Sequence, residues 1–262
     1  MIQKNQNIIF DKKINRIVEY NPDYQQITLP DQRYYKRGEN LFYPSVTYIL
    51  NYLPKNKFFE SWLKDVGHNA DVIMRKAGDE GTQVHNAAEA LIAGNEISWF
   101  DENGNAKYNT EVWRMIIKFH NFWTTHKPEV IVSEYSIFSD KHKYAGTIDL
   151  VVRMNDKIWL LDIKTSNTLH RSHDLQLSTY ACAWNETHDT PIDNTGIIWL
   201  KAATRGPDKQ GKKIQGEGWQ LKQPENHYTD DFNMFLNVYS LFKDDHPELK
   251  PDTEILPTKL KI

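Results

Sequence analysis

The chain has 262 residues, a formal net charge of −3, 39% hydrophobic residues and 26% charged residues, a composition typical of a soluble globular protein with one large core. No apolar run reaches the roughly 18 residues of a membrane span, and the first residues lack the pattern of a secretion signal. A single cysteine, Cys182, excludes an internal disulfide and a cysteine-bound zinc or iron–sulfur cluster, so we expect a cytoplasmic protein.

Residues 1–43 predict a strand-rich N-terminal arm. Short runs of β-branched and aromatic residues alternate there with proline-containing breaks. The extended candidates are residues 8–10, 16–20 and 26–29, and the breaks are Asn21-Pro22 and Pro30-Asp31.

Residues 44–127 predict an α-helical cap. Ser45 follows Pro44 and precedes a helical pattern, which makes it a candidate N-cap. Apolar residues then recur at helical spacing over three further stretches, about residues 57–64, 68–93 and 109–126.

Residues 128–245 predict an α/β core, followed by a peripheral tail over residues 246–262. Strand-forming segments and helical patterns alternate in this part of the chain. Strands are expected at residues 130–138, 144–154, 157–164 and 196–200, and helices at residues 171–188 and 228–243.

Two aspartates are predicted to face one another across the hairpin of residues 144–154 and 157–164. Asn155-Asp156 suits a two-residue turn, which places Asp149 opposite Asp162 on one face of the sheet. Carboxylates about 5 Å apart repel by roughly 3 kcal/mol at an effective dielectric of about 20. One of them must therefore be protonated, or a cation must lie between them, and Mg²⁺ is the usual hard cation for oxygen ligands.

Lys164 adds a cationic group to this pair. It lies two residues after Asp162 and shares its face of the strand, while Ile163 points into the core. An ammonium beside two carboxylates and a metal ion can hold an attacking water and neutralise charge that develops on a phosphate. The acid-x-Lys pattern alone is a weak signal, because it also occurs at Asp11–Lys13 and Glu248–Lys250, and most such pairs are solvated edges.

Six segments form an ordered set over roughly residues 33–185. They are Arg33-Tyr34, Pro44–Leu50, Gly81–His85, Tyr144–Val151, Leu161–Ser166 and Gln176–Tyr180. Each is weak alone, but together they resemble the PD-(D/E)XK nuclease superfamily. More narrowly, they resemble its RecB-type exonuclease branch, which includes phage exonucleases and the mitochondrial genome maintenance exonuclease.

The resemblance implies a restriction-endonuclease-like fold, in which a mixed central sheet is flanked by helices. It also implies a nuclease that depends on one or two Mg²⁺ or Mn²⁺ ions. Several RecB-type relatives bind an iron–sulfur cluster through four cysteines. This chain has one cysteine, so no cluster is expected.

The resemblance assigns the metal ligands and the catalytic lysine. By this likeness Asp149 and Asp162 would bind the metal together with the backbone carbonyl of Ile163. His85, from the helical cap, would be an additional ligand, and Lys164 would be the catalytic lysine.

Further site residues follow from the same resemblance. Gln176 and Tyr180 match a Gln-x-x-x-Tyr motif that lines the active site and positions the substrate, and Glu134 matches an acidic position of many members. Glu89 lies one helical turn after His85 and is a candidate acceptor for its second ring nitrogen. Outside this context, a helical histidine or tyrosine is commonly an ordinary surface or core residue.

The slightly negative charge predicts that DNA contacts come from a local patch or through bound metal, because proteins that coat nucleic acid are usually basic. Ser45 and Thr47 lie at a helix N-terminus, which either binds a phosphate or is simply capped. Residues 201–216 are either a basic loop that grips the DNA backbone or a solvated hairpin tip. The basic candidates in this segment are Lys201, Arg205, Lys212 and Lys213.

A set of aromatic residues in the first part of the chain either stacks on bases or fills the core. They are Tyr34, Tyr35, Tyr43, Tyr48 and Trp62.

We therefore expect a metal-dependent deoxyribonuclease that acts as an exonuclease on single-stranded DNA ends in replication, repair or recombination. A bacterial or phage-infected cell and a recombination or replication partner fit that role. The alternatives are a structure- or site-specific endonuclease of the same superfamily, a catalytically inactive nucleic-acid-binding protein, and a metal-stabilised α/β protein without a nucleic-acid role. The repulsive Asp149–Asp162 pair argues against an inactive site, which has little reason to keep it.

Overall fold

The computed structural model describes residues 7–11, 16–21, 25–29, 31–55, 57–201 and 218–257. The chain divides into two compact units that are interleaved in the sequence. Unit 1 consists of Met1–Leu53, Ser136–Thr147 and Phe232–Ile262, and unit 2 consists of Pro54–Tyr135 and Ile148–Asp231.

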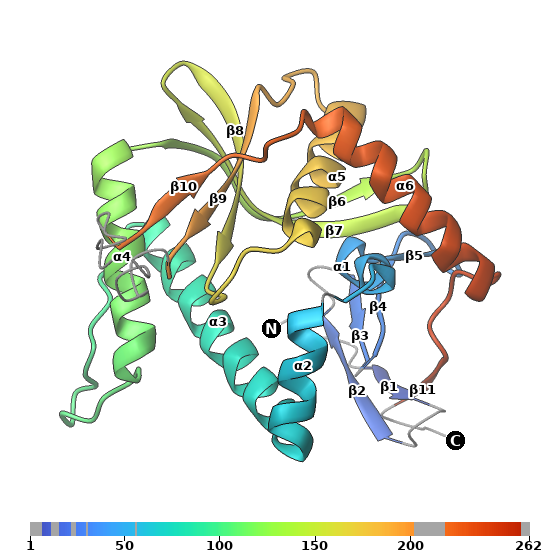
Figure 1. Ribbon diagram of the computed structural model, residues 1–262, viewed down its shortest axis with the longest axis horizontal. Coiled ribbons are helices and arrows are strands. Elements are labelled where there is room, and N and C mark those ends of the chain that lie inside the picture. The colour runs from blue at the N-terminus through green and yellow to red at the C-terminus, as the bar shows by residue number, and fades with distance from the viewer. Residues whose placement is uncertain are drawn as a thin grey trace. The chain divides into compact units, whose positions relative to one another are not determined.

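Unit 1 contains an antiparallel sheet with the strand order β11-β1-β2-β3-β4-β5 (Figure 1). The predicted strands of the N-terminal arm are present as β1, β2 and β3. The sequence did not predict β4, β5 or β11, and β11 comes from the tail that was expected to be peripheral. The bounds are β1 (Asn7–Asp11), β2 (Arg16–Asn21), β3 (Gln26–Thr28), β4 (Arg33–Lys36), β5 (Phe42–Pro44) and β11 (Thr253–Pro257).

A short helix, α1 (Val46–Ile49), follows β5 and continues into a 3-10 turn. Its predicted N-cap is confirmed, because Ser45 Oγ accepts a hydrogen bond from the Tyr48 N–H at 3.0 Å. The tyrosines that could have stacked on bases are instead buried in this unit, with exposed fractions of 8% or less. They are Tyr34, Tyr35, Tyr43 and Tyr48.

The central sheet has the order β10-β9-β8-β7-β6. Strands β8 and β9 are parallel, whereas β7–β8 and β9–β10 are antiparallel. The predicted mixed α/β sheet is therefore confirmed, and the short strand β10 was not predicted. The bounds are β6 (Glu129–Ser139), β7 (Tyr144–Met154), β8 (Lys157–Lys164), β9 (Asn194–Trp199) and β10 (Gln220–Lys222).

The predicted two-residue turn between β7 and β8 is confirmed. Asn155 and Asp156 have φ angles of 51° and 58°, and two consecutive left-handed residues are the signature of a type I′ hairpin turn. The register runs from Met154–Lys157 to Leu150–Leu161, as the sequence predicted. The turn thereby sets the pairing of β7 and β8 as far as Leu150 and Leu161, the neighbours of Asp149 and Asp162.

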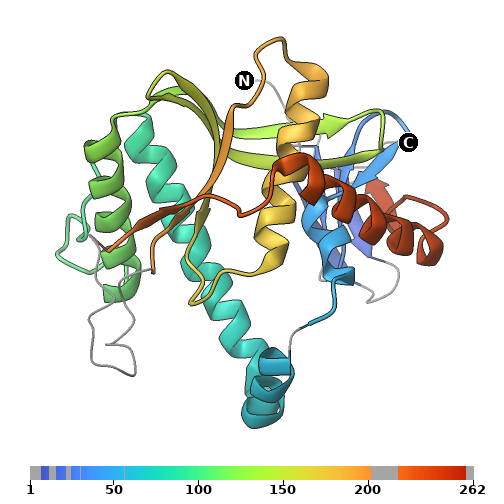
Figure 2. The same ribbon diagram turned by 45° about the horizontal axis from the view of Figure 1, so that its top comes forward.

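Within unit 2, helices cover both faces of the central sheet (Figure 2). The helices α3 (Ala70–Ile92) and α4 (Thr110–His126) form a core with β7 and β8 that includes Leu161 and Ile163. Alternate residues of β8 point to the opposite face, where α5 (Arg171–Thr187) contacts β8 and β9. The remaining helices are α2 (Lys57–Val66), which buries no side chain, and α6 (Tyr228–Asp245). None of the helices in the described ranges is long and apolar enough to cross a membrane.

Candidate active site

The end of β8 presents an acid and a lysine to α5. Strand alternation buries Ile163 in the α3–α4 core, with 3% of its surface exposed, and turns Asp162 and Lys164 to the other face. Lys164 Nζ lies 2.7 Å from Asp162 Oδ2, and 4% of the Asp162 side chain is exposed. A buried carboxylate needs such a partner, because an unpaired charge at this depth would be costly.

A hydrogen-bonded row continues from Lys164 into α5. Lys164 Nζ donates to Gln176 Oε1 at 3.1 Å, and Gln176 Nε2 donates to the Tyr180 hydroxyl at 3.4 Å. Gln176 and Tyr180 are one helical turn apart and both buried. The structure therefore brings these three predicted residues and Asp162 into one connected polar network.

A second set of contacts centres on His85 of α3. Its Nε2 lies 3.1 Å from the carbonyl oxygen of Ile163, and its Nδ1 lies 3.6 Å from Asp149 Oδ2 and 3.9 Å from Glu134 Oε1. Asp149 Oδ2 also accepts the Ile163 N–H at 2.7 Å. Side chains from α3, β6 and β7 thus converge on the backbone of β8.

The backbone of β6 is irregular at this point. Glu134 has φ 45°, in the left-handed region that a non-glycine residue rarely adopts within a strand. Such interruptions change the direction of a side chain and are frequent beside active sites. Here the residue with the unusual conformation is the one whose carboxylate faces His85.

The local charges keep both cationic side chains protonated when no metal ion is bound. Burial lowers the pKa of His85, but the charge of Asp149 and the hydrogen bond of Glu134 outweigh it and raise the pKa to about 9. Burial also opposes the charge of Lys164, yet the nearby carboxylates of Asp162 and Asp149 raise its pKa. The site therefore pairs two cations with three carboxylates.

His85, Glu134 and Asp149 form a cluster that could hold a metal ion. Each offers one ligand atom, and these atoms lie within 4.8 Å of one another. The three side chains are 28%, 26% and 13% exposed, so they are accessible from solvent yet held by their surroundings. Asp162 lies outside this cluster and is engaged by Lys164.

The model of the PD-(D/E)XK nuclease superfamily matches residues 57–244. The chain belongs to this superfamily. The resemblance seen in the sequence is confirmed at that level, and membership indicates a nuclease with DNA as its substrate. No curated protein matches the chain.

PD-(D/E)XK nucleases use divalent metal ions, and the donor set present here fits one. Two carboxylates and an imidazole are partly buried at one point, and the Ile163 carbonyl oxygen lies beside the imidazole. Oxygen donors suit hard divalent cations, and an imidazole is a common additional ligand. A divalent cation would also replace the proton that otherwise neutralises this cluster.

Other predicted residues lie apart from these contacts or outside the described ranges. Glu89 is exposed on α3, and the contacts of the His85 ring nitrogens are with Ile163, Asp149 and Glu134. In unit 1, Ser45 caps α1, and the exposed Thr47 lines a cavity of about 390 Å³. Lys201 is partly buried just after β9, and Arg205, Lys212 and Lys213 lie outside the described residues.

Two features of α5 were not predicted from the sequence. His173 lies one helical turn before Gln176, the residue that holds Lys164 Nζ. Arg171 forms an ion pair with Asp231, which is 0% exposed. The signal for His173 was its spacing of three and seven residues before Gln176 and Tyr180. The Arg171–Asp231 pair had no local signal, since 60 positions separate the two residues.

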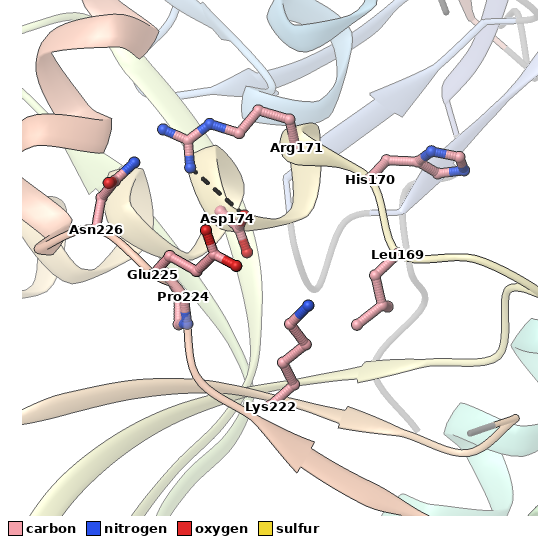
Figure 3. A pocket seen from close by; sticks show the side chains of 8 residues that line it. All are labelled: Leu169, His170, Arg171, Asp174, Lys222, Pro224, Glu225 and Asn226. Carbon is pink, nitrogen blue, oxygen red and sulfur yellow. Dashed lines mark hydrogen bonds and ion pairs between the residues drawn. The ribbon is translucent and has the colours of Figure 1, made fainter. Parts of the chain in front are cut away.

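The N-terminal end of α5 also borders a cavity of about 270 Å³ (Figure 3). Its walls come from α5, from β10 and from the segment that follows β10. Figure 3 shows charged side chains of both signs around it. The lining residues are Leu169, His170, Arg171, Asp174, Lys222, Pro224, Glu225 and Asn226.

Proposed function

We propose that this PD-(D/E)XK nuclease is a Mg²⁺- or Mn²⁺-dependent deoxyribonuclease that works as an exonuclease on single-stranded DNA ends. The observation that carries the proposal is the pairing of two arrangements at the end of β8. One is the cluster of His85, Glu134 and Asp149, and the other is the network that joins Asp162 and Lys164 to Gln176. Together they supply metal ligands and a charged lysine within one unit.

In this proposal His85, Glu134 and Asp149 would hold the cation, and the Ile163 carbonyl and Asp162 would add oxygen ligands. A divalent cation at this point would lower the pKa of an attacking water and offset charge on the phosphate.

The protein's own contribution centres on the Lys164 ammonium. Its raised pKa keeps it charged at neutral pH, so it can orient the attacking water and stabilise negative charge on the phosphate in the transition state. Gln176 holds Nζ through its amide oxygen, and Tyr180 in turn holds Gln176. This support fixes the ammonium before the substrate binds, which is the condition for electrostatic stabilisation to be effective.

The exonuclease mode rests on the resemblance to the RecB-type branch, which the segments Gly81–His85 and Gln176–Tyr180 support. We extend the proposal to a role in replication, repair or recombination, with a protein partner from one of these processes.

The test is digestion of end-labelled linear single-stranded, duplex and circular DNA with Mg²⁺ or Mn²⁺, and with EDTA as the metal-free condition. We expect loss of linear single strands, with circles intact and EDTA abolishing cleavage. Lys164→Ala should lower the rate by about 100-fold or more. Lys157→Ala on the same strand should cut like the wild type, because Lys157 is 58% exposed and pairs with Asp193.

Metal binding is measured separately, as the rise in Tm that Mn²⁺ produces. Glu134→Gln should reduce that rise, whereas Glu129→Gln on the same strand should keep it, because Glu129 is 73% exposed and pairs with Arg153. Cleavage of circular DNA would show that the protein is an endonuclease and not an exonuclease. Tight DNA binding without any cleavage by the wild type would show that it is a DNA-binding protein without nuclease activity.

A further inference from the structure

His173 extends the row of polar side chains that α5 presents to the candidate active site. It lies three residues before Gln176 and seven before Tyr180, so the three share one face of the helix. Gln176, one helical turn further along this face, accepts a hydrogen bond from Lys164 Nζ at 3.1 Å. The likeness to the nuclease branch assigned no role to His173.

The hydrogen bonding of the ring fixes where its proton lies. His173 Nδ1 accepts the backbone N–H of His170 at 3.3 Å, so the proton of the neutral ring is on Nε2. Within the described part of the chain, no other hydrogen bond to the ring is present. Nε2–H is therefore a donor whose partner the protein does not provide.

A cavity adjoins His170, the residue that packs against the His173 ring. His170 packs against His173 with the ring centroids 5.5 Å apart, and His170 also lines the cavity of about 270 Å³ at this end of α5. In Figure 3 this cavity is bordered by Lys222 and Arg171. The cavity therefore lies next to the His170–His173 ring pair, with room for part of a nucleotide chain.

We propose that His173 donates a hydrogen bond from Nε2 to a non-bridging oxygen of the phosphate that is cleaved, as a second donor next to Lys164. This inference rests on the proposed nuclease function. It makes His173 a catalytic residue, because its ring touches the reacting phosphate. The two ring nitrogens then have different roles, because Nδ1 caps α5 and Nε2 donates a hydrogen bond to the substrate.

Two substitutions separate these roles. His173→Asn keeps an oxygen near the Nδ1 position, which can still accept the His170 N–H, but it has no donor at the Nε2 position. His173→Gln reaches further and places an amide N–H near the position of Nε2. We expect single-turnover cleavage to fall by about 10- to 100-fold in His173→Asn, the loss typical of one hydrogen bond to a charged oxygen. His173→Gln should cleave about tenfold faster than His173→Asn.

A phosphorothioate substrate gives a readout that a purely structural role would not change. Sulfur in place of the contacted oxygen weakens the hydrogen bond, so it should slow the wild type but have a smaller effect on His173→Asn. The Tm of both variants, measured alongside, reports on the capping role of Nδ1.

The outcomes are distinguishable. Wild-type rates in His173→Asn would overturn the inference and leave the nuclease function standing. Equal losses in both variants with a lowered Tm and an unchanged sulfur effect would show that His173 only caps α5, and would also overturn it. If the wild type itself cleaves no DNA, the proposed function fails, and the inference fails with it.

Discussion

Asp162 is the most deeply buried charged side chain of the candidate active site, with 4% exposed against 13% for Asp149. At that depth a carboxylate stays ionised only beside a cation, and Lys164 at 2.7 Å fills this role. The need is mutual, because burial also opposes the charge on Lys164. The ion pair therefore fixes the position of the ammonium that Gln176 then holds from the other side.

At the same scale, the pKa of His173 predicts a dependence of stability on pH. Its pKa is about 4 in the folded protein because of burial and Lys164, with Asp162 opposing and His170 adding to the shift. In the unfolded chain the pKa of a histidine side chain is about 6.5. Between these two pH values the unfolded state binds more protons than the folded state. The contribution of His173 to the free energy of unfolding is therefore complete above pH 6.5 and is lost as the pH falls towards 4.

Urea unfolding at pH 7.5, 6.5 and 5 checks this prediction. The free energy of unfolding of the wild type should fall relative to that of His173→Asn by about 1 kcal/mol between pH 7.5 and 5, after allowance for solvent screening. A constant difference across this range would show that the ring is not protected from protonation.

Among the elements, α5 connects the candidate active site to the rest of unit 2. One face carries His173, Gln176 and Tyr180, while its first residue, Arg171, pairs with the buried Asp231. An arginine is unfavourable in the first turn of a helix, because the helix dipole is positive there. The ion pair with Asp231 offsets that cost and fixes the N-terminal end of the helix.

The predicted consequence is a large loss of stability on removing Arg171. Among the described residues, Arg171→Ala leaves the buried Asp231 side chain the Asn226 amide at 3.0 Å as its partner, so the free energy of unfolding should fall by about 2–3 kcal/mol. Arg114→Ala is the matched control, since Arg114 is 62% exposed and pairs with Glu111 on the same helix. That change should cost less than about 0.5 kcal/mol, and equal losses in urea unfolding would contradict the prediction.

The hairpin of β7 and β8 is the element that the sequence predicted best. A two-residue turn with left-handed backbone and strict strand alternation determine its register. Strand alternation also predicted that the side chain of Ile163 lies on the opposite face of β8 from those of Asp162 and Lys164. It did not predict that Asp149 would accept the Ile163 N–H. Nor did it predict that Asp149 would face His85, because this contact depends on how α3 packs on the sheet.

For the whole molecule, the sequence predicted the long elements and missed several of the short ones. Strands β4, β5, β10 and β11 have three to five residues, too few for alternation to be distinguished from a loop. Strand β11 also pairs with β1, from the opposite end of the chain, and no local pattern reports such a contact. His173 was also missed, although its spacing before Gln176 and Tyr180 was a local signal, because its place near the site depends on how α5 packs on β8.

The β1–β11 pair predicts how unit 1 responds to truncation. Removing residues from Thr253 onwards deletes β11 and exposes the edge of β1, which is paired to it over five register positions. We expect Tm to fall by about 5 °C or more and the protein to associate at high concentration. Removing only residues 258–262 is the control, and light scattering with thermal melts compares the two. An unchanged Tm in the longer truncation would show that β11 does not stabilise the sheet.

The register of β1 and β11 has a further consequence for chain connectivity. Asn7 and Pro257 are paired, so the first and last described residues are about 5 Å apart. A short linker between the two ends would therefore give a circular permutant, opened instead at the exposed turn near Gly94. The interleaved order of the two units in the chain would then change, while every residue of the candidate active site would keep its place in the same unit.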